Sequence, residues 1–314
     1  MMKIGFLFPG QGAQSLGMGK DIYEQYESAK NIYNKVKEIT GIDIAKISFE
    51  GPEETLNETK NTQLAILTMS LAILGILKEN NITCEMSAGL SLGEYSALIN
   101  SEAISFEEGI KLVQKRGRFM QELLPKGDWQ MAAILGMTEE QVEEVCKRVK
   151  AGFVVPANYN SVGQIAISGE KDAVLEAESI AKEMGAKKVV VLKTAGPFHT
   201  EKLLDASNAL SKELENITTN EFKSKVIKNI DGTEYKDTEN IKEILAKHIV
   251  SPVRFSKSLE NMIKAGIDTF VEIGPGKTLS GFLKRIPTDK EIRILNINNV
   301  SSLEETIKNI KEEV

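Results

Sequence analysis

The sequence predicts a mixed α/β protein in which a smaller domain is inserted into a larger one. Its 314 residues are more than one core of ordinary size needs. Short apolar segments alternate with segments of helical periodicity over much of the chain. The composition changes near Pro125-Lys126-Gly127-Asp128, where a different order of elements begins.

Before this change, the pattern predicts strands that alternate with helices. Ile4 to Phe8 is an apolar run that stops at Pro-Gly, which is typical of a buried strand. The run from Leu64 to Leu77 carries no charge but is too short to span a bilayer, so we expect a helix buried on all sides. The expected elements are a strand at 4–8, helices at 21–40 and 62–78, a strand at 82–88, and helices at 91–99 and 106–124.

After the change, the order of elements becomes β-α-β-β-α-β. The expected elements are strands at 131–135, 153–157, 164–168 and 187–192, with helices at 138–150 and 171–184. Thr138 and Gln141 have the spacing of a capping box at the start of the first helix. This order is that of a ferredoxin-like unit. We therefore assign residues 126–197 to an inserted ferredoxin-like domain, and residues 1–125 and 198–314 to the large domain.

The last third of the chain returns to helices and strands of the large domain. Gly274-Pro275-Gly276 predicts a turn between a strand and a helix. The expected elements are helices at 199–217, 240–249 and 256–265, a strand at 268–273, a helix after the turn, and a charged amphipathic helix at 302–314.

Charge and composition exclude several classes of function. The net charge of −6 argues against nucleic-acid binding, which needs a basic face. The two cysteines, Cys84 and Cys146, lack metal-ligand spacing and are expected to be free thiols, and two histidines in the whole chain argue against a zinc site, so we expect no metal. The N-terminal apolar run is too short for a signal peptide, which predicts a cytoplasmic protein that does not enter a membrane.

Gly89-Leu90-Ser91-Leu92-Gly93 is a G-x-S-x-G pattern, here called the elbow. In such a turn a strand bends sharply into a helix and exposes a serine at the helix N-terminus, where the N–H of Leu92 is free to donate to an oxyanion. The pattern also arises by chance in chains of this length. Its position between an expected strand and an expected helix favours a nucleophilic serine in an α/β-hydrolase-like large domain.

A nucleophilic serine needs a general base. His199 lies in an expected loop between a strand and a helix, whereas His248 lies near the end of an expected helix, where a cap or a core position is the ordinary interpretation. His199 is therefore the predicted base. The nearest acids, Glu201 and Asp205, are expected to face solvent, so no third member of a triad is identified.

The loop around Gln11 follows the first expected strand. Glycines on both sides of Gln11 allow the backbone to approach a ligand, so its N–H is a candidate second oxyanion donor. An ordinary tight turn or a phosphate loop explains this fragment equally well. The P-loop and dinucleotide patterns are absent from it.

Several motifs in one order resemble a known family. They are Phe8-Pro9-Gly10-Gln11-Gly12-Ala13-Gln14, Gly89-x-Ser91-Leu92-Gly93-Glu94-Tyr95, Gln114-x-Arg116-Gly117, Asn158-x-Asn160-Ser161-x-Gly163-Gln164, Phe198-His199 and Glu272-x-Gly274-Pro275-Gly276. Together they are similar to the malonyl-CoA:acyl-carrier-protein transacylases of fatty-acid synthesis, from about residue 3 to residue 285.

The resemblance implies a two-step acyl transfer without a cofactor. Ser91 would attack the malonyl thioester of CoA while His199 takes its proton, and the N–H groups of Gln11 and Leu92 would bind the oxyanion. The thiol of acyl-carrier protein would then take the malonyl group by the reverse route. In this family a backbone carbonyl, at the position of His248, orients the catalytic histidine.

The resemblance also implies a substrate site. Lys111, Lys115, Arg116 and Arg118 form a basic run that would ordinarily be solvated, but the family match places Arg116 in the pocket, where its guanidinium would bind the malonyl carboxylate. Phe198 would narrow the space over the acyl α-carbon. The other residues expected at the substrate are Gln63, Asn160 and His248.

Two positions depart from the family: Leu90 replaces a histidine and His248 replaces a glutamine. Leu90 puts strict selectivity for malonyl in doubt. A polyketide acyltransferase and a thioester hydrolase remain alternatives, as does a non-catalytic subunit that binds the carrier protein. A monomer is expected, with an acidic carrier protein docking on a basic rim drawn from Lys187, Lys188, Lys193, Lys277, Lys284 and Arg285.

Overall fold

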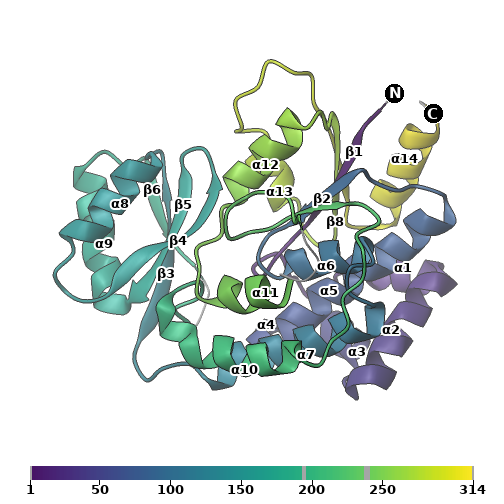
Figure 1. The fold of residues 1–314 in the computed structure, drawn as a ribbon, viewed down its shortest axis with the longest axis horizontal. Coiled ribbons are helices and arrows are strands. Elements are labelled where there is room, and N and C mark those ends of the chain that lie inside the picture. Colours follow the sequence, from purple (N-terminus) through teal and green to yellow (C-terminus); the bar gives the residue numbers. More distant parts are fainter. Residues whose placement is uncertain (1, 193–195, 237–240, 313–314) are drawn as a thin grey trace.

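A parallel sheet lies at the centre of the larger part of the molecule, and an antiparallel sheet with its own helices forms a smaller part (Figure 1). The structure, a computed structural model, describes residues 2–192, 196–236 and 241–312. The two sheets confirm the predicted fold class, an α/β-hydrolase-like domain with an inserted ferredoxin-like one. The exact domain boundaries stay a prediction.

The parallel sheet has five strands in the order β7-β2-β1-β8-β9. They are β1 (Ile4–Phe8), β2 (Met86–Gly89), β7 (Lys225–Ile227), β8 (Thr269–Ile273) and β9 (Arg293–Ile297). Because the strands are parallel, their carboxyl ends meet at one edge, where ligands bind in open α/β sheets. Phe8 pairs with Gly89 at this edge, so the Gln11 loop and the elbow lie side by side.

Side chains of β1 alternate between two cores, as the period of a strand requires. Phe6 and Phe8 belong to a cluster built around the long helix α5 (Thr59–Glu79), whereas Leu7 belongs to a cluster that includes α12 (Phe255–Lys264) and α13 (Thr278–Leu283). The helices of this part are α1 (Lys20–Gln25), α2 (Glu27–Thr40), α3 (Ile44–Glu50), α4 (Glu53–Asn57), α5 (Thr59–Glu79), α6 (Gly93–Asn100), α7 (Phe106–Glu122), a 3₁₀ turn η1 (Glu201–Leu203), α10 (Leu204–Leu214), α11 (Ile241–Ile249), α12 (Phe255–Lys264), α13 (Thr278–Leu283) and α14 (Val300–Lys311).

Helix α5 is the buried helix that the sequence predicts. Among the described residues it is the one helix long and apolar enough to cross a membrane, yet 89% of its apolar window is buried inside the fold. The apolar side chains of this helix therefore form part of the core of the large domain.

The antiparallel sheet has the order β4-β5-β3-β6. Its elements are β3 (Trp129–Leu135), α8 (Glu139–Arg148), β4 (Val154–Ser161), β5 (Gln164–Glu170), α9 (Lys171–Glu183) and β6 (Lys188–Val191). β5 separates β3 from β4, and β3 separates β5 from β6, which is the split βαβ arrangement. The predicted capping box of Thr138 and Gln141 is present at the start of α8.

The outer edge of β4 is tied to the large domain. Tyr159 N–H donates to Val253 O and Val253 N–H donates to Ala157 O, both at 2.8 Å. The Arg254 guanidinium lies 3.7 Å from the centre of the Tyr159 ring. This contact fixes the end of β4, and with it Asn160, next to the large domain.

Several elements differ from the sequence prediction. The helix expected at 21–40 is broken at Tyr26, whose backbone is extended, so α1 and α2 form instead. The helix expected at 199–217 begins later, because His199 has a left-handed backbone with φ of 59° and the chain enters η1 first. α3, α4, β7 and β9 were not predicted, since they are short segments with little periodicity. Asn240 and Lys193 lie outside the described residues.

Candidate active site

The elbow connects β2 to α6. Ser91 has φ of 53°, a left-handed backbone that is strained for any residue other than glycine. A Cβ at Gly89 would lie 1.9 Å from Gly93 C, and a Cβ at Gly93 would lie 2.1 Å from Phe8 O. The turn therefore needs glycine at both positions, which explains the G-x-S-x-G pattern physically.

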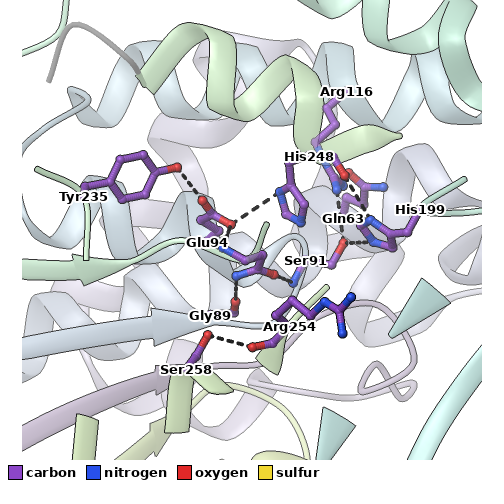
Figure 2. A network of polar contacts seen from close by, with 11 residues as sticks. Gln63, Gly89, Ser91, Glu94, Arg116, His199, Tyr235, His248, Arg254 and Ser258 are labelled. Atoms are coloured by element: carbon purple, nitrogen blue, oxygen red, sulfur yellow. Dashed lines mark hydrogen bonds and ion pairs between the residues drawn. The ribbon is translucent and has the colours of Figure 1, made fainter. Parts of the chain in front are cut away.

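Ser91 and His199 form a hydrogen-bonded pair although they are 108 positions apart in the chain (Figure 2). Ser91 Oγ lies 2.8 Å from His199 Nε2, and His199 Nδ1 lies 3.1 Å from the carbonyl oxygen of His248. A carbonyl can only accept, so Nδ1 carries the proton and Nε2 is left to accept from the serine hydroxyl. Burial, and then the nearby Arg116 charge, lower the pKa of His199 to about 4.

Arg116 lies beside this pair and is only 1% exposed. Its guanidinium donates to Gln63 Oε1 at 2.6 Å and to Ser91 Oγ at 3.1 Å. Within the described part of the chain, no carboxylate lies within 4 Å of the guanidinium and its Nε has no hydrogen-bond partner. Burial lowers the pKa of Arg116. Glu94 favours the charged form of Arg116 through space, but no carboxylate of the described residues contacts the guanidinium directly. A buried cation without a directly bonded carboxylate favours an anionic ligand next to Ser91.

A cavity of about 120 Å³ opens onto Ser91 and His199. Gln11, Asn160 and Phe198 contribute to its wall, together with Leu90, Met120, Met131, Asn158, Ala166 and Leu192. Asn160 is 8% exposed and its Oδ1 has no partner among the described residues. Residues beside the parallel sheet and residues of the antiparallel sheet therefore line the cavity, and Asn158 and Asn160 make one side of it polar.

Two backbone donors remain available beside this cavity. No hydrogen bond among the described residues uses the N–H of Gln11 or of Leu92. Leu92 precedes the first residue of α6, so its N–H has the orientation of a helix N-terminus. These two N–H groups are the ones that the family resemblance implies as oxyanion donors, and that role stays a prediction.

His248 and Gln63, which were expected to contact the substrate, lie outside the wall of the cavity. His248 does not appear in the cavity wall; its carbonyl meets His199, and its ring stacks on the His199 ring with centroids 5.1 Å apart. Gln63 meets the guanidinium of Arg116 and likewise lies outside the wall. Both therefore act on residues of the site. Arg116 also lies outside the wall and meets the cavity only through its hydrogen bond to Ser91 Oγ, so a direct substrate contact stays a prediction for all three residues.

Sequence reasoning missed a buried network behind the elbow (Figure 2). Asn229 is fully buried and bonds to both Ser91 N and Gly89 O, while Glu94 accepts from Asn229 N and from the hydroxyl of Tyr235. Burial raises the pKa of Glu94 to about 7. Glu94 stood in the elbow motif without an assigned role, and nothing in the local pattern distinguished Asn229.

The ring of His248 completes this network without a regular hydrogen bond. Its Nδ1 lies 3.4 Å from Glu94 Oε2, but neither ring nitrogen has a partner of hydrogen-bond geometry among the described residues. Burial lowers the pKa of His248. We therefore regard this contact as one between a neutral imidazole and a carboxyl group, not as an ion pair.

A strained serine, a buried histidine and free backbone donors are features of serine enzymes that form an acyl intermediate, and the comparison with known families narrows this class to acyltransferases. The family model described as an acyl transferase domain matches residues 5–309. The chain belongs to this family.

Similar proteins narrow the class. The chain is 41% identical to the malonyl CoA-acyl carrier protein transacylase of Bacillus subtilis, over 100% of this chain and 99% of the relative. A crystal structure of the same kind of protein from Clostridium perfringens is 45% identical, covers 99% of this chain and 98% of its own, and superposes with a TM-score of 0.93. The chain is thus similar throughout to malonyl CoA-acyl carrier protein transacylases.

A third structure is a complex with a carrier protein. It is described as a type II polyketide synthase acyl-carrier protein bound to its malonyl-transacylase, and it is 35% identical, with a TM-score of 0.93 and 98% of this chain and 99% of its own covered. That transacylase therefore has the same fold as this chain.

Proposed function

We propose that this protein transfers a malonyl group from malonyl-CoA to the phosphopantetheine thiol of acyl-carrier protein, in type II fatty-acid biosynthesis. The observation that carries the proposal is the buried guanidinium of Arg116, without a carboxylate partner among the described residues and 3.1 Å from Ser91 Oγ. A malonyl group esterified to Ser91 ends in the carboxylate that this cation lacks, and a guanidinium can bind a carboxylate with two parallel hydrogen bonds.

In the first half-reaction Ser91 is the nucleophile. Its Oγ attacks the thioester carbonyl of malonyl-CoA while its proton passes to His199 Nε2, 2.8 Å away. The N–H groups of Gln11 and Leu92 stabilise the negative charge on the carbonyl oxygen. The C–S bond then breaks, and the CoA sulfur leaves with the proton from His199.

The second half-reaction runs through the same atoms in reverse. The carrier-protein thiol gives its proton to His199 and attacks the malonyl-Ser91 ester, and Ser91 Oγ recovers a proton as the ester bond breaks. Because the pKa of His199 is lowered to about 4, the imidazole is neutral at neutral pH and ready to accept a proton in each half. The carbonyl of His248 orients the ring, which replaces the acid of a triad.

The residues of the cavity wall determine which acyl groups the site accepts. Phe198 is 5% exposed and lines the cavity beside His199, so it limits branching at the acyl α-carbon. Asn160 offers an unpaired side-chain oxygen, and Gln63 supports Arg116 from behind. Leu90 lies in the same wall and adds apolar surface where the family has a polar side chain.

The carrier protein is the expected partner. Carrier proteins are acidic, and Lys187, Lys188 and Arg285 line an opening of about 760 Å³ that also contains three glutamates. Lys193, another expected docking residue, lies outside the described residues. We also propose that the protein is a cytoplasmic monomer that uses no cofactor.

The carrier complex of the 35% identical relative makes a polyketide carrier protein the second candidate acceptor. One experiment tests both: incubation with malonyl-CoA and either no carrier, a fatty-acid carrier or a polyketide carrier. Release of CoA at a sustained rate only with the fatty-acid carrier supports the proposal, and preference for the polyketide carrier selects the second candidate. Equal release without any carrier would indicate a hydrolase.

A further inference from the structure

The side chain of Asn229 bridges two points of the elbow. Its Oδ1 accepts the N–H of Ser91 and its Nδ2 donates to the carbonyl of Gly89, both at 2.7 Å. Asn229 comes just after β7, 138 positions away from Ser91, and is fully buried. It does not appear in the wall of the cavity. Its carboxamide therefore contacts the nucleophile's backbone from a place that substrate does not reach.

The backbone of Ser91 needs such support. A left-handed backbone in a non-glycine residue costs roughly 1–3 kcal/mol and persists only where surrounding contacts hold it. The bond from Ser91 N–H to Asn229 fixes the peptide plane between Leu90 and Ser91. It also occupies the N–H of Ser91, so that the N–H of Leu92 is the elbow donor left for an oxyanion.

Asn229 is itself held at its backbone. Its N–H donates to Glu94 Oε2 at 3.0 Å, and its carbonyl accepts the N–H of Arg254 at 2.8 Å. Glu94 lies on α6, directly after the elbow, and also accepts from Tyr235. Every polar group of Asn229 thus has a partner, and the contacts form a closed ring from the elbow through Asn229 to α6. Fully satisfied buried networks of this kind fix a single geometry.

We propose that Asn229 is a positioning residue for acyl transfer, whose carboxamide holds the elbow so that Ser91 Oγ meets His199 and the Leu92 N–H faces the oxyanion. This inference rests on the proposed role of Ser91 as nucleophile. Both half-reactions pass through the same elbow geometry, so losing the carboxamide slows both to the same extent. Binding of malonyl-CoA is unaffected, because Asn229 does not touch it.

The test is Asn229→Ala with Asn261→Ala as its matched control. Asn261 Nδ2 donates to Gly232 O at 2.7 Å, so it braces the same loop without touching the elbow. For Asn229→Ala we expect kcat, and the rate of malonyl-enzyme formation, to fall roughly 10- to 100-fold, with KM changed by less than about threefold. For Asn261→Ala we expect a lower melting temperature and an unchanged kcat. Equal kcat values in the two variants would overturn the proposal.

A second variant, Asn229→Asp, keeps the shape of the side chain. Only its protonated form can accept from Ser91 N–H and donate to Gly89 O at once. We expect burial, together with the acidic groups Glu94 and Asp231, to raise the pKa of the introduced carboxyl, as burial does for Glu94. The Arg116 charge acts in the opposite direction, and Tyr235 and His248 are the other titratable neighbours. The acylation rate relative to wild type should therefore rise as the pH falls from about 8 to about 6.

A ratio that does not change with pH would overturn the positioning role, since a purely structural defect would move the melting temperature instead. If wild-type protein forms no malonyl adduct at all, the proposed function fails first, and the role of Asn229 fails with it. If wild type forms the adduct and Asn229→Ala forms it equally fast, only the inference about Asn229 is wrong.

Discussion

Replacing Arg116 by alanine tests the assignment of the acyl group. The substitution removes the buried cation that lies 3.1 Å from Ser91 Oγ and leaves the malonyl carboxylate without its partner. Removing one partner of a buried charge pair costs about 2–5 kcal/mol, which corresponds to a fall of roughly 30- to 5,000-fold in kcat/KM for malonyl-CoA. Acetyl-CoA has no carboxylate, so its transfer should stay the same or rise.

The assay is CoA release from malonyl-CoA and acetyl-CoA, measured for wild type and Arg116→Ala under one condition. Gln63 Oε1 also loses its donor in this variant, so a melting curve is needed to show that the protein remains folded. Arg116→Lys serves as the control, because it keeps the charge and loses the planar fork; its malonyl activity should be intermediate. If malonyl and acetyl transfer fell by the same factor, Arg116 would be structural and the reasoning would be refuted.

Three further predictions follow from the site. Burial lowers the pKa of His199 to about 4 from an ordinary 6.5, so kcat/KM for CoA release should fall only as the pH approaches 4. A fall in kcat/KM centred near pH 6.5 would contradict the burial argument. Phe198→Ala widens the cavity, so the ratio of methylmalonyl to malonyl transfer should rise by roughly tenfold or more in a competition assay, whereas an unchanged ratio would remove Phe198 from selectivity. Burial raises the pKa of Glu94 to about 7, whereas its unfolded pKa is 4.5, so the folded state binds this proton more tightly than the unfolded state. The stabilisation that results is fully present below pH 4.5 and is lost as the pH rises through 7. Glu94→Gln should therefore show a smaller drop in melting temperature between about pH 5 and pH 8 than wild type, and an equal drop would show that Glu94 does not titrate there.

Long or strongly periodic elements were predictable because their signal is local. The buried helix α5, the capping box at Thr138 and the β-α-β-β-α-β order of the small domain all follow from spacing and composition. β7 and β9 did not follow, because three to five residues of modest hydrophobicity become strands only when a sheet edge is there to pair with them.

The site divides in the same way. Ser91, His199 and Arg116 were identified because their motifs occur in a recognisable order along the chain. In the structure, Ser91 Oγ lies within hydrogen-bonding distance of both His199 and Arg116. Asn229 was missed because its role depends on a contact across 138 positions of the chain. His248 illustrates a mixed case: its carbonyl lies where the resemblance implies, while its ring packs against His199 and Glu94 in a way that the sequence could not predict.

Ser91 is the residue that we expect to carry the acyl group. The most direct test is the intact mass of the protein after brief incubation with malonyl-CoA and no carrier protein, for wild type and Ser91→Ala. We expect one malonyl adduct on wild type, its loss on addition of holo carrier protein, and none on Ser91→Ala. An adduct that persists in Ser91→Ala, or a wild-type protein that transfers malonyl without ever forming one, would contradict it.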